Sequence, residues 1–188
     1  LSEPAKRRHL HTRTIIAEGY ARDDGLWDIE GRLTDTKTYG FANRDRGRIE
    51  AGDPLHDMRV RLTVDLDLRI HRIEATTEAS PYRICPDIAP NYRKLEGVVI
   101  GPGWRTRIRD VAGGREGCTH ISELLGAMAT AAYQTLYAER ARRGAPPLAG
   151  EGKRPSWVDS CYALRAEGEV VRREWPHYAK DQAREPND

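Results

Sequence analysis

The sequence is poor in the residues that cross-link a protein or carry it through a membrane. Its 188 residues include three cysteines and one phenylalanine, and no apolar run approaches the length of a membrane-spanning helix. Three cysteines are a sparse and odd set, which favours reduced thiols, metal ligands or small buried side chains over a disulfide framework. The opening stretch LSEPAKRRHLHTR has no apolar core of the kind a secretory signal needs. We therefore expect a cytoplasmic protein outside the membrane.

An excess of one charge sign is also missing. Lysine and arginine number 31 against 29 aspartate and glutamate residues, and the two signs are interspersed along the chain. Nucleic-acid-binding proteins usually concentrate basic charge on one side, so no nucleic-acid partner is expected.

A chain of this length can bury roughly two thirds of its unfolded surface in one compact domain. A small-molecule ligand is the expected partner, and the oligomeric state is not predicted.

Alternating apolar residues predict an antiparallel sheet. Two extended segments in residues 11–41 meet at Arg22-Asp23-Asp24-Gly25, where Asp-Gly favours a tight hairpin turn. Residues 43–54 are polar and are expected to form a loop. Residues 58–64 alternate strictly between apolar and polar, and after a turn at 65–67 a partner strand follows. We expect His56 and Asp57 to lie at the entrance of the first of these strands, pointing off the sheet edge.

The second half of the chain is predicted to be mainly helical. Cys85-Pro86 precedes an expected helix at 87–95, a short helical segment is expected at 106–111, and a long helix should run from Thr119, as its N-cap, to Arg142. The expected fold class is α+β, with a small antiparallel sheet and helices packed on one face.

The expected domain organisation has four parts. Residues 1–10 form a flexible arm, 11–143 the α+β domain with its N-terminal β-hairpin, 144–155 a Pro- and Gly-rich linker, and 156–188 a C-terminal extension packed on the domain.

Five residues of metal-binding type lie at the ends of predicted elements: His56, Asp57, Cys85, Cys118 and His120. Thiolate, imidazole and carboxylate ligands together match the preferences of zinc and iron. No pair has the CxxC spacing of a zinc ribbon, so the prediction depends on three loops converging. We expect Asp57, Cys85, Cys118 and His120 to hold Zn or Fe, and His56 to complete the shell or act in catalysis. Glu123, one turn beyond His120, is expected to transfer protons.

Structural roles for the same residues stay open. Cysteine is often only a small buried side chain, and His120 could simply cap a helix. Asp35 and Lys37 with Tyr39 could act as acid/base groups, although charged strand ends are commoner. Cys161 could join the site or pack in a core.

Residues 55–137 loosely resemble the iron-sulphur cluster scaffold proteins of the IscU/NifU type. The likeness rests on an acidic strand entrance, two antiparallel strands, a cysteine before a helix, and a cysteine beside a histidine opening a long helix. It implies an IscU-like core in which Asp57 with His56, Cys85, and Cys118 with His120 are ligands. The chain departs from that family because it has Cys-Thr-His in place of adjacent His-Cys and a histidine in place of the first cysteine. One thiolate fewer favours a mononuclear metal site over cluster assembly.

Nearly the whole chain is also similar to a proteobacterial family of unknown function, through the segments DGLWDIEG, LTDTKTY, HDM, PYRICP, GCTH and SCYALR. Members of that family are commonly found among genes for degrading aromatic compounds, which implies an aromatic substrate.

Three hypotheses about function follow. The first is an enzyme, a lyase or hydrolase that uses a metal or, failing that, a thiolate and histidine. The second is a non-catalytic metal or iron-sulphur carrier, and the third is a binding module with structural cysteines.

Overall fold

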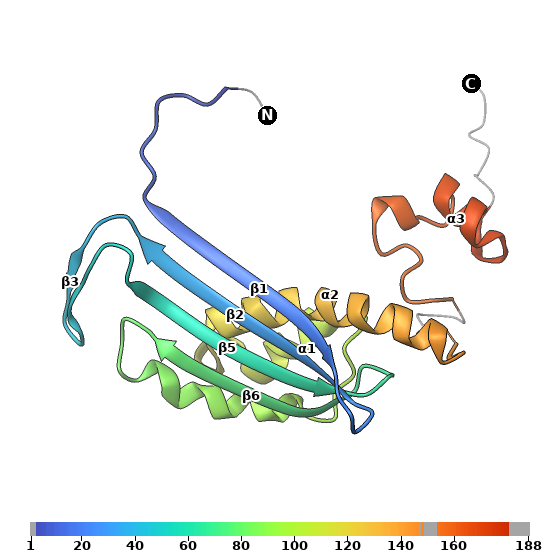
Figure 1. Ribbon diagram of the computed structural model, residues 1–188, viewed down its shortest axis with the longest axis horizontal. Coiled ribbons are helices and arrows are strands. Elements are labelled where there is room, and N and C mark those ends of the chain that lie inside the picture. Colours follow the sequence, from blue (N-terminus) through green and yellow to red (C-terminus); the bar gives the residue numbers. More distant parts are fainter. Residues whose placement is uncertain (1–2, 147, 149–153, 181–188) are drawn as a thin grey trace. The chain divides into compact units, whose positions relative to one another are not determined.

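A computed structural model describes residues 3–146, 148 and 154–180 (Figure 1). The chain divides into two compact units, Leu1–Ala138 and Glu139–Asp188. Each unit is described by itself below.

The first unit is built on a four-stranded antiparallel sheet. Its strands are β1 (His11–Ala21), β2 (Trp27–Lys37), β5 (Pro54–Val64) and β6 (Ile70–Ala79), in the spatial order β1-β2-β5-β6. The β1–β2 hairpin turns through Gly25, whose φ of 84° is the left-handed conformation that glycine adopts easily. The predicted hairpin, the second strand pair and the α+β fold class are confirmed.

Two predicted boundaries were wrong. The segment 43–54, expected to be a loop, contains the strand β4 (Gly47–Ile49), which pairs with β3 (Phe41–Asn43) in a small hairpin, because Gly47 supplies a left-handed turn between short strands. Strand β5 begins at Pro54, so His56 and Asp57 lie inside the strand and not at its entrance. Because successive strand residues point to opposite faces, these two side chains diverge.

The inner face of the sheet carries the core. Residues that alternate along β2 and β5 face the helices and are almost fully buried: Trp27, Ile29, Leu33, Met58, Val60, Leu62 and Val64. Gly31 belongs to the same row, and a Cβ there would lie 2.5 Å from Met128 Sδ of the long helix. The missing side chain lets the helix approach the middle of the sheet.

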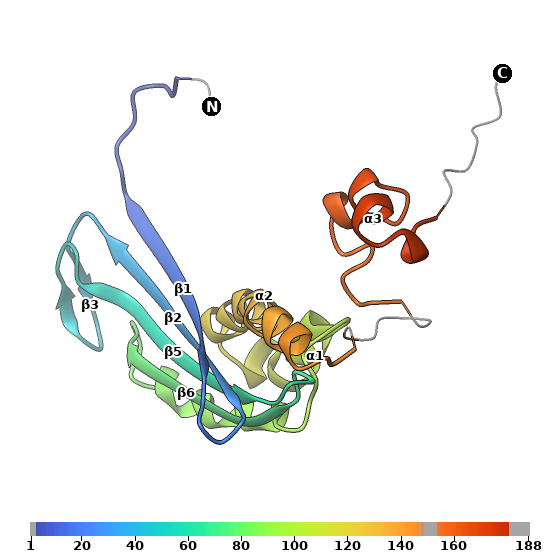
Figure 2. The same ribbon diagram turned by 45° about the vertical axis from the view of Figure 1, so that its right-hand side comes forward.

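The helices lie on this inner face (Figures 1 and 2). They are the 3₁₀ helices η1 (Cys85–Leu95) and η2 (Gly114–Glu116) and the α-helices α1 (Trp104–Ala112) and α2 (Thr119–Arg142). Thr119 was expected to be the N-cap of α2, but it is the first helical residue. The Cys118 carbonyl accepts the Ser122 N–H at 3.0 Å, so Cys118 occupies the cap position. This one-residue shift places the thiol at the start of the helix.

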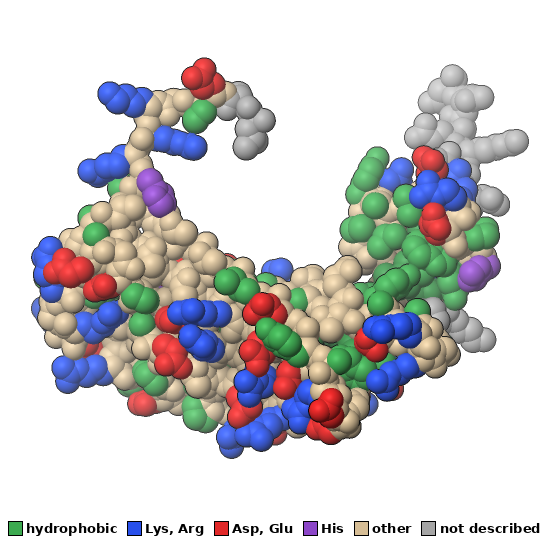
Figure 3. All heavy atoms as spheres, in the orientation of Figure 1, with side chains coloured by type: hydrophobic (Ala, Val, Ile, Leu, Met, Phe, Trp, Pro, Cys, Tyr) green, Lys and Arg blue, Asp and Glu red, His purple; other side chains and the backbone are tan. Residues whose placement is uncertain are grey.

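The outer face of the sheet is a lattice of ion pairs. Arg61 pairs with Glu30 at 2.8 Å and Glu74 at 3.7 Å, and Arg32 pairs with Asp57. Figure 3 shows positive and negative side chains interspersed over one side of the molecule. Interspersed charge agrees with the small net charge of +2.

The second unit contains short elements: η4 (Tyr162–Leu164), α3 (Glu169–Glu174) and η5 (Pro176–Tyr178). Trp157 packs on Trp175 with ring centroids 4.1 Å apart, which gives this unit a small aromatic core of its own. Cys161 is exposed. Residues 147 and 149–153 of the predicted linker lie outside the described residues, and packing of the tail on the first unit stays a prediction. Among the described helices, none has the length and apolar character needed to cross a bilayer.

Candidate functional site

The inner row of the sheet changes from apolar to polar at one end. Two residues beyond Leu33 the row reaches Asp35, and two residues before Met58 it reaches His56. The register places Arg13 of β1 and His56 of β5 on either side of Asp35 of β2. The same alternation that builds the core therefore points these polar groups to the side where the helices lie.

Asp35 is the centre of the cluster and is only 2% exposed. Its Oδ1 accepts hydrogen bonds from His11 Nε2 at 2.9 Å and Arg13 Nε at 2.8 Å. Its Oδ2 accepts from Arg13 Nη2 at 2.8 Å and His56 Nδ1 at 3.0 Å. A bidentate arginine and two imidazoles thus fill the usual acceptor positions of one buried carboxylate.

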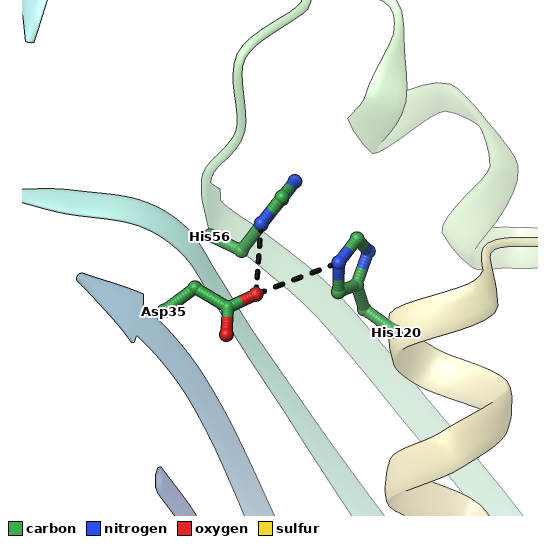
Figure 4. Close-up of side chains that lie close together, drawn as sticks. All are labelled: Asp35, His56 and His120. Atoms are coloured by element: carbon green, nitrogen blue, oxygen red, sulfur yellow. Dashed lines mark hydrogen bonds and ion pairs between the residues drawn. The ribbon is translucent and has the colours of Figure 1, made fainter. Parts of the chain in front are cut away.

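Helix α2 adds a third imidazole to this group. His120 Nε2 lies 3.5 Å from Asp35 Oδ2, and the His120 ring stacks on His56 with centroids 3.8 Å apart and planes 30° apart (Figure 4). The other ring nitrogen, Nδ1, is 3.8 Å from Cys118 Sγ. His120 consequently stands between a thiol and a buried carboxylate.

The protonation states follow from burial and charge. Burial would disfavour the Asp35 carboxylate, but the hydrogen bond and charge of Arg13, with hydrogen bonds from His11 and His56, hold the pKa of Asp35 well below its usual range. Burial lowers the pKa of His56, although its bond to Asp35 opposes that shift. Burial, then the charges of His56 and Arg13, lower the pKa of His120. Burial thus favours the neutral form of both imidazoles.

Contacts with η1 and α1 fix the start of α2. The Tyr92 hydroxyl accepts the Cys118 N–H at 2.8 Å and lies 2.8 Å from the Cys118 carbonyl and 3.0 Å from Ser122 Oγ. Tyr92 is fully buried, so this clamp has no water to compete with it. A Cβ at Gly117 would lie 1.8 Å from the Ala112 carbonyl oxygen, so only glycine permits this close approach.

A pocket of about 550 Å³ opens beside Cys118 and His120. Its lining includes His56, Cys85 and Arg115, and its apolar walls are formed by Met58, Pro81, Ile84 and Ile88. A mainly apolar concavity with a few convergent polar groups is the usual form of a small-molecule site.

The six residues predicted from the sequence fall into three groups. His56, Cys85, Cys118 and His120 all line this pocket. Glu123 lies beside the cluster, where its carboxylate is hydrogen-bonded to Arg13 Nη1. Asp57 lies on the outer face of the sheet, where both its oxygens accept from Arg32, at 2.9 and 2.7 Å.

Sequence reasoning missed the contributions of His11 and Arg13 and gave Asp35 only a minor role. The sequence could have indicated the role of Asp35, because side chains alternate between the two faces of a strand and Asp35 therefore points to the same face as the buried Leu33. Three residues bring one possible ligand atom each to within 4.8 Å of one another: Asp35, His56 and His120. One carboxylate and two neutral imidazoles are a donor set that suits zinc or ferrous iron.

Comparison with known proteins places the chain in a family. No curated protein and no solved structure matches it. Residues 11–134 match the family described as "Protein of unknown function (DUF2889)", and this segment contains the whole sheet and every residue of the Asp35 cluster. The chain therefore belongs to the DUF2889 family.

Proposed function

We propose that the protein is a thiol-dependent hydrolase that cleaves esters or thioesters of small apolar acids, with Cys118 as the nucleophile. The observation that carries the proposal is the position of His120, with Nδ1 facing Cys118 Sγ at 3.8 Å and Nε2 facing Asp35 Oδ2 at 3.5 Å. A thiol, a base and a group that orients the base are the parts that covalent catalysis requires.

The reaction requires one tautomer of His120. A neutral His120 with its proton on Nε2, the nitrogen on the Asp35 side, has a free lone pair on Nδ1, the nitrogen that faces the thiol. His120 accepts the Cys118 proton, and the thiolate attacks the acyl carbon. As the bond from that carbon to the leaving oxygen or sulphur breaks, the imidazolium returns the proton to the leaving group. Buried Asp35 stabilises the imidazolium between these two transfers.

Helix α2 supports the same chemistry. The first N–H groups of a helix have no partner within the helix, and their dipoles favour negative charge. Cys118 stands at this position, so α2 stabilises both the thiolate and the oxyanion that forms on the substrate.

His56 is suited to the second half of the reaction. It donates Nδ1–H to Asp35 at 3.0 Å, and a neutral ring then has its lone pair on Nε2. His56 lines the pocket and can activate the water that hydrolyses the acyl-thiol. The apolar walls favour an apolar acyl group, which is compatible with the aromatic substrate expected from the sequence.

Incubation with the activated ester p-nitrophenyl acetate tests the proposal. We expect a burst of p-nitrophenolate and an acetyl group on the Cys118 peptide, measured by mass spectrometry. His120→Gln should slow the burst by about 100-fold, the contribution of a positioned base. Cys161→Ser is the matched control, because Cys161 is an exposed thiol in the other unit, and it should leave the burst unchanged. Acetylation confined to Cys85, or a burst that is insensitive to His120→Gln, would contradict the proposal.

A metal centre on Asp35, His56 and His120 is the second candidate, favoured by the convergence of their ligand atoms. The donor set fits, but Arg13 already occupies both carboxylate oxygens, and its cation would lie beside the ion. A bound Zn or Fe would supply a Lewis acid for lyase or hydrolytic chemistry, and a carrier role would use the same ligands. The cysteines of the pocket wall could take part as soft ligands.

Elemental analysis separates the two candidates. Protein prepared without a metal-affinity tag should contain about one equivalent of zinc or iron if the metal centre is correct. Chelation should then abolish activity, whereas the thiol mechanism predicts activity that survives chelation. Visible absorption would favour an iron-sulphur carrier.

A further inference from the structure

Arg115 lies in η2 and lines the same pocket as Cys118 and His120. Its side chain has no hydrogen bond or ion pair with any residue that the structure describes. The other arginine near the cluster, Arg13, has its charge engaged by Asp35 and Glu123. Arg115 is therefore the pocket's free cation.

The backbone that carries Arg115 is held on both sides. Asn91 Nδ2 donates to the carbonyl oxygens of Val111 and Glu116, and Tyr92 binds the backbone of Cys118. Gly114 has a φ of 58°, a left-handed turn that a residue with a side chain adopts only with strain. Arg115 thus stands on a fixed loop, three positions before the proposed nucleophile.

Asp87 of η1 is the other charged residue in the pocket lining. It forms no ion pair with Arg115, although both side chains belong to the described part of the chain. The pocket therefore has one positively charged side chain, Arg115, and one negatively charged side chain, Asp87, in its lining. A negative group of a ligand is attracted to the Arg115 side and repelled from the Asp87 side.

We infer that Arg115 makes the pocket selective for substrates that carry a carboxylate, and that it holds this group beside Cys118. A planar guanidinium with free donors matches the two oxygens of a carboxylate. The inference rests on the proposed function, because it concerns the same pocket and thiol. It narrows the substrate class to half-esters or half-thioesters of small apolar diacids, in which one carboxyl group stays free.

Two alkylating reagents test the inference on the full-length protein. Iodoacetate and iodoacetamide both react by forming a bond from sulphur to carbon with loss of iodide, but only iodoacetate is an anion. The rate of modification of the Cys118 peptide is followed by mass spectrometry in the presence of a chelator. Arg115→Gln should lower the iodoacetate-to-iodoacetamide rate ratio by about fivefold, the factor expected of one exposed charge pair.

Controls separate a local effect from a general change in charge. Arg107→Gln removes the same charge from α1 at an exposed position outside the pocket lining, and should leave the ratio near that of the natural chain. Arg115→Lys should keep most of the preference because it keeps the charge. Added salt should lower the ratio in the natural chain and have less effect in Arg115→Gln.

An equal ratio in Arg115→Gln and Arg107→Gln would overturn the inference. The iodoacetamide rate alone reports on the proposed function, since this reagent is neutral. If His120→Gln left the iodoacetamide rate unchanged, activation of the thiol by His120 would be refuted, while the effect of Arg115 on the ratio could still be measured.

Discussion

Asp35 and Asp57 lie on neighbouring strands, and both are buried carboxylates held by a two-pronged arginine. They differ in the face of the sheet to which they point. Asp57 points outward, where Arg32 is its partner and is itself 45% exposed. Asp35 points inward, where three imidazoles and a helix start surround it. An Asp–Arg pair of the same kind is thus part of a surface network of ion pairs on one face and the centre of a candidate active site on the other.

The largest difference should appear in reactivity. Asp35→Asn removes the charge that orients His120 and stabilises its protonated form, so acetylation of Cys118 should fall by about 10²- to 10⁴-fold. Asp57→Asn should change the rate by less than about twofold, because Asp57 and its partner Arg32 lie on the face of the sheet opposite to Cys118. Burst kinetics with p-nitrophenyl acetate measure both. Equal effects would remove the distinction between the two faces.

The next largest effect concerns the loop that brings α2 to the inner face. Gly117→Ala should lower the free energy of unfolding by about 3 kcal/mol, because a Cβ there would collide with backbone. Gly126→Ala, within α2, is the control. The nearest atom to its added Cβ is 3.9 Å away, so it should raise stability by about 0.5–1 kcal/mol. Urea unfolding gives both values, and a neutral Gly117→Ala would show that the loop has room to move.

Exchange of each arginine for lysine sharpens the comparison further. Arg13→Lys replaces a fork that meets both oxygens of Asp35 with a single ammonium, and should cost about 1–2 kcal/mol of stability. Arg32→Lys should cost about 0.5 kcal/mol or less, since water can complete the Asp57 contacts at a more exposed position. A double-mutant cycle with the corresponding Asp→Asn change isolates each pair.

Acidification should destabilise the inner cluster in two steps. His56 and His120 have lowered pKa values in the folded state. Their contribution to the free energy of unfolding is therefore complete above 6.5, the pKa of histidine in the unfolded chain, and declines as the pH falls below it. Asp35 also has a lowered pKa in the folded state. Its contribution to the free energy of unfolding is complete above 3.8, the pKa of aspartate in the unfolded chain, and is lost at lower pH. Urea midpoints between pH 8 and pH 3 test this, and His56→Gln with His120→Gln should remove the first step.

The sequence predicted the elements of the fold because their signals are local. The alternation from Met58 to Val64 identifies the strand β5, and the turn at Arg22 to Gly25 identifies the β1–β2 hairpin. The same alternation, extended by one step, would have turned His56 inward and Asp57 outward. The predicted placement of Asp57 at the strand entrance was wrong because the strand was expected to begin after that residue.

The partners of the site were harder to predict, because they depend on packing between distant segments. Nothing local indicates that His120 meets the Asp35 end of the sheet, since that depends on how α2 crosses the strands. A different β1–β2 register would have set Arg13 opposite another residue of β2. The β1–β2 register decides in favour of Asp35, and a register follows from the turn only once the strands are known to pair.

The pairing of Arg13 with Glu123 spans 110 positions of the chain. During synthesis at about 5–20 residues per second, β1 therefore leaves the ribosome roughly 5–20 s before the helix that completes its contacts. Throughout that interval Asp35 can hold Arg13 and His11, which come from the same hairpin. The candidate site can therefore be completed only after the start of α2, with Cys118 and His120, has been synthesised.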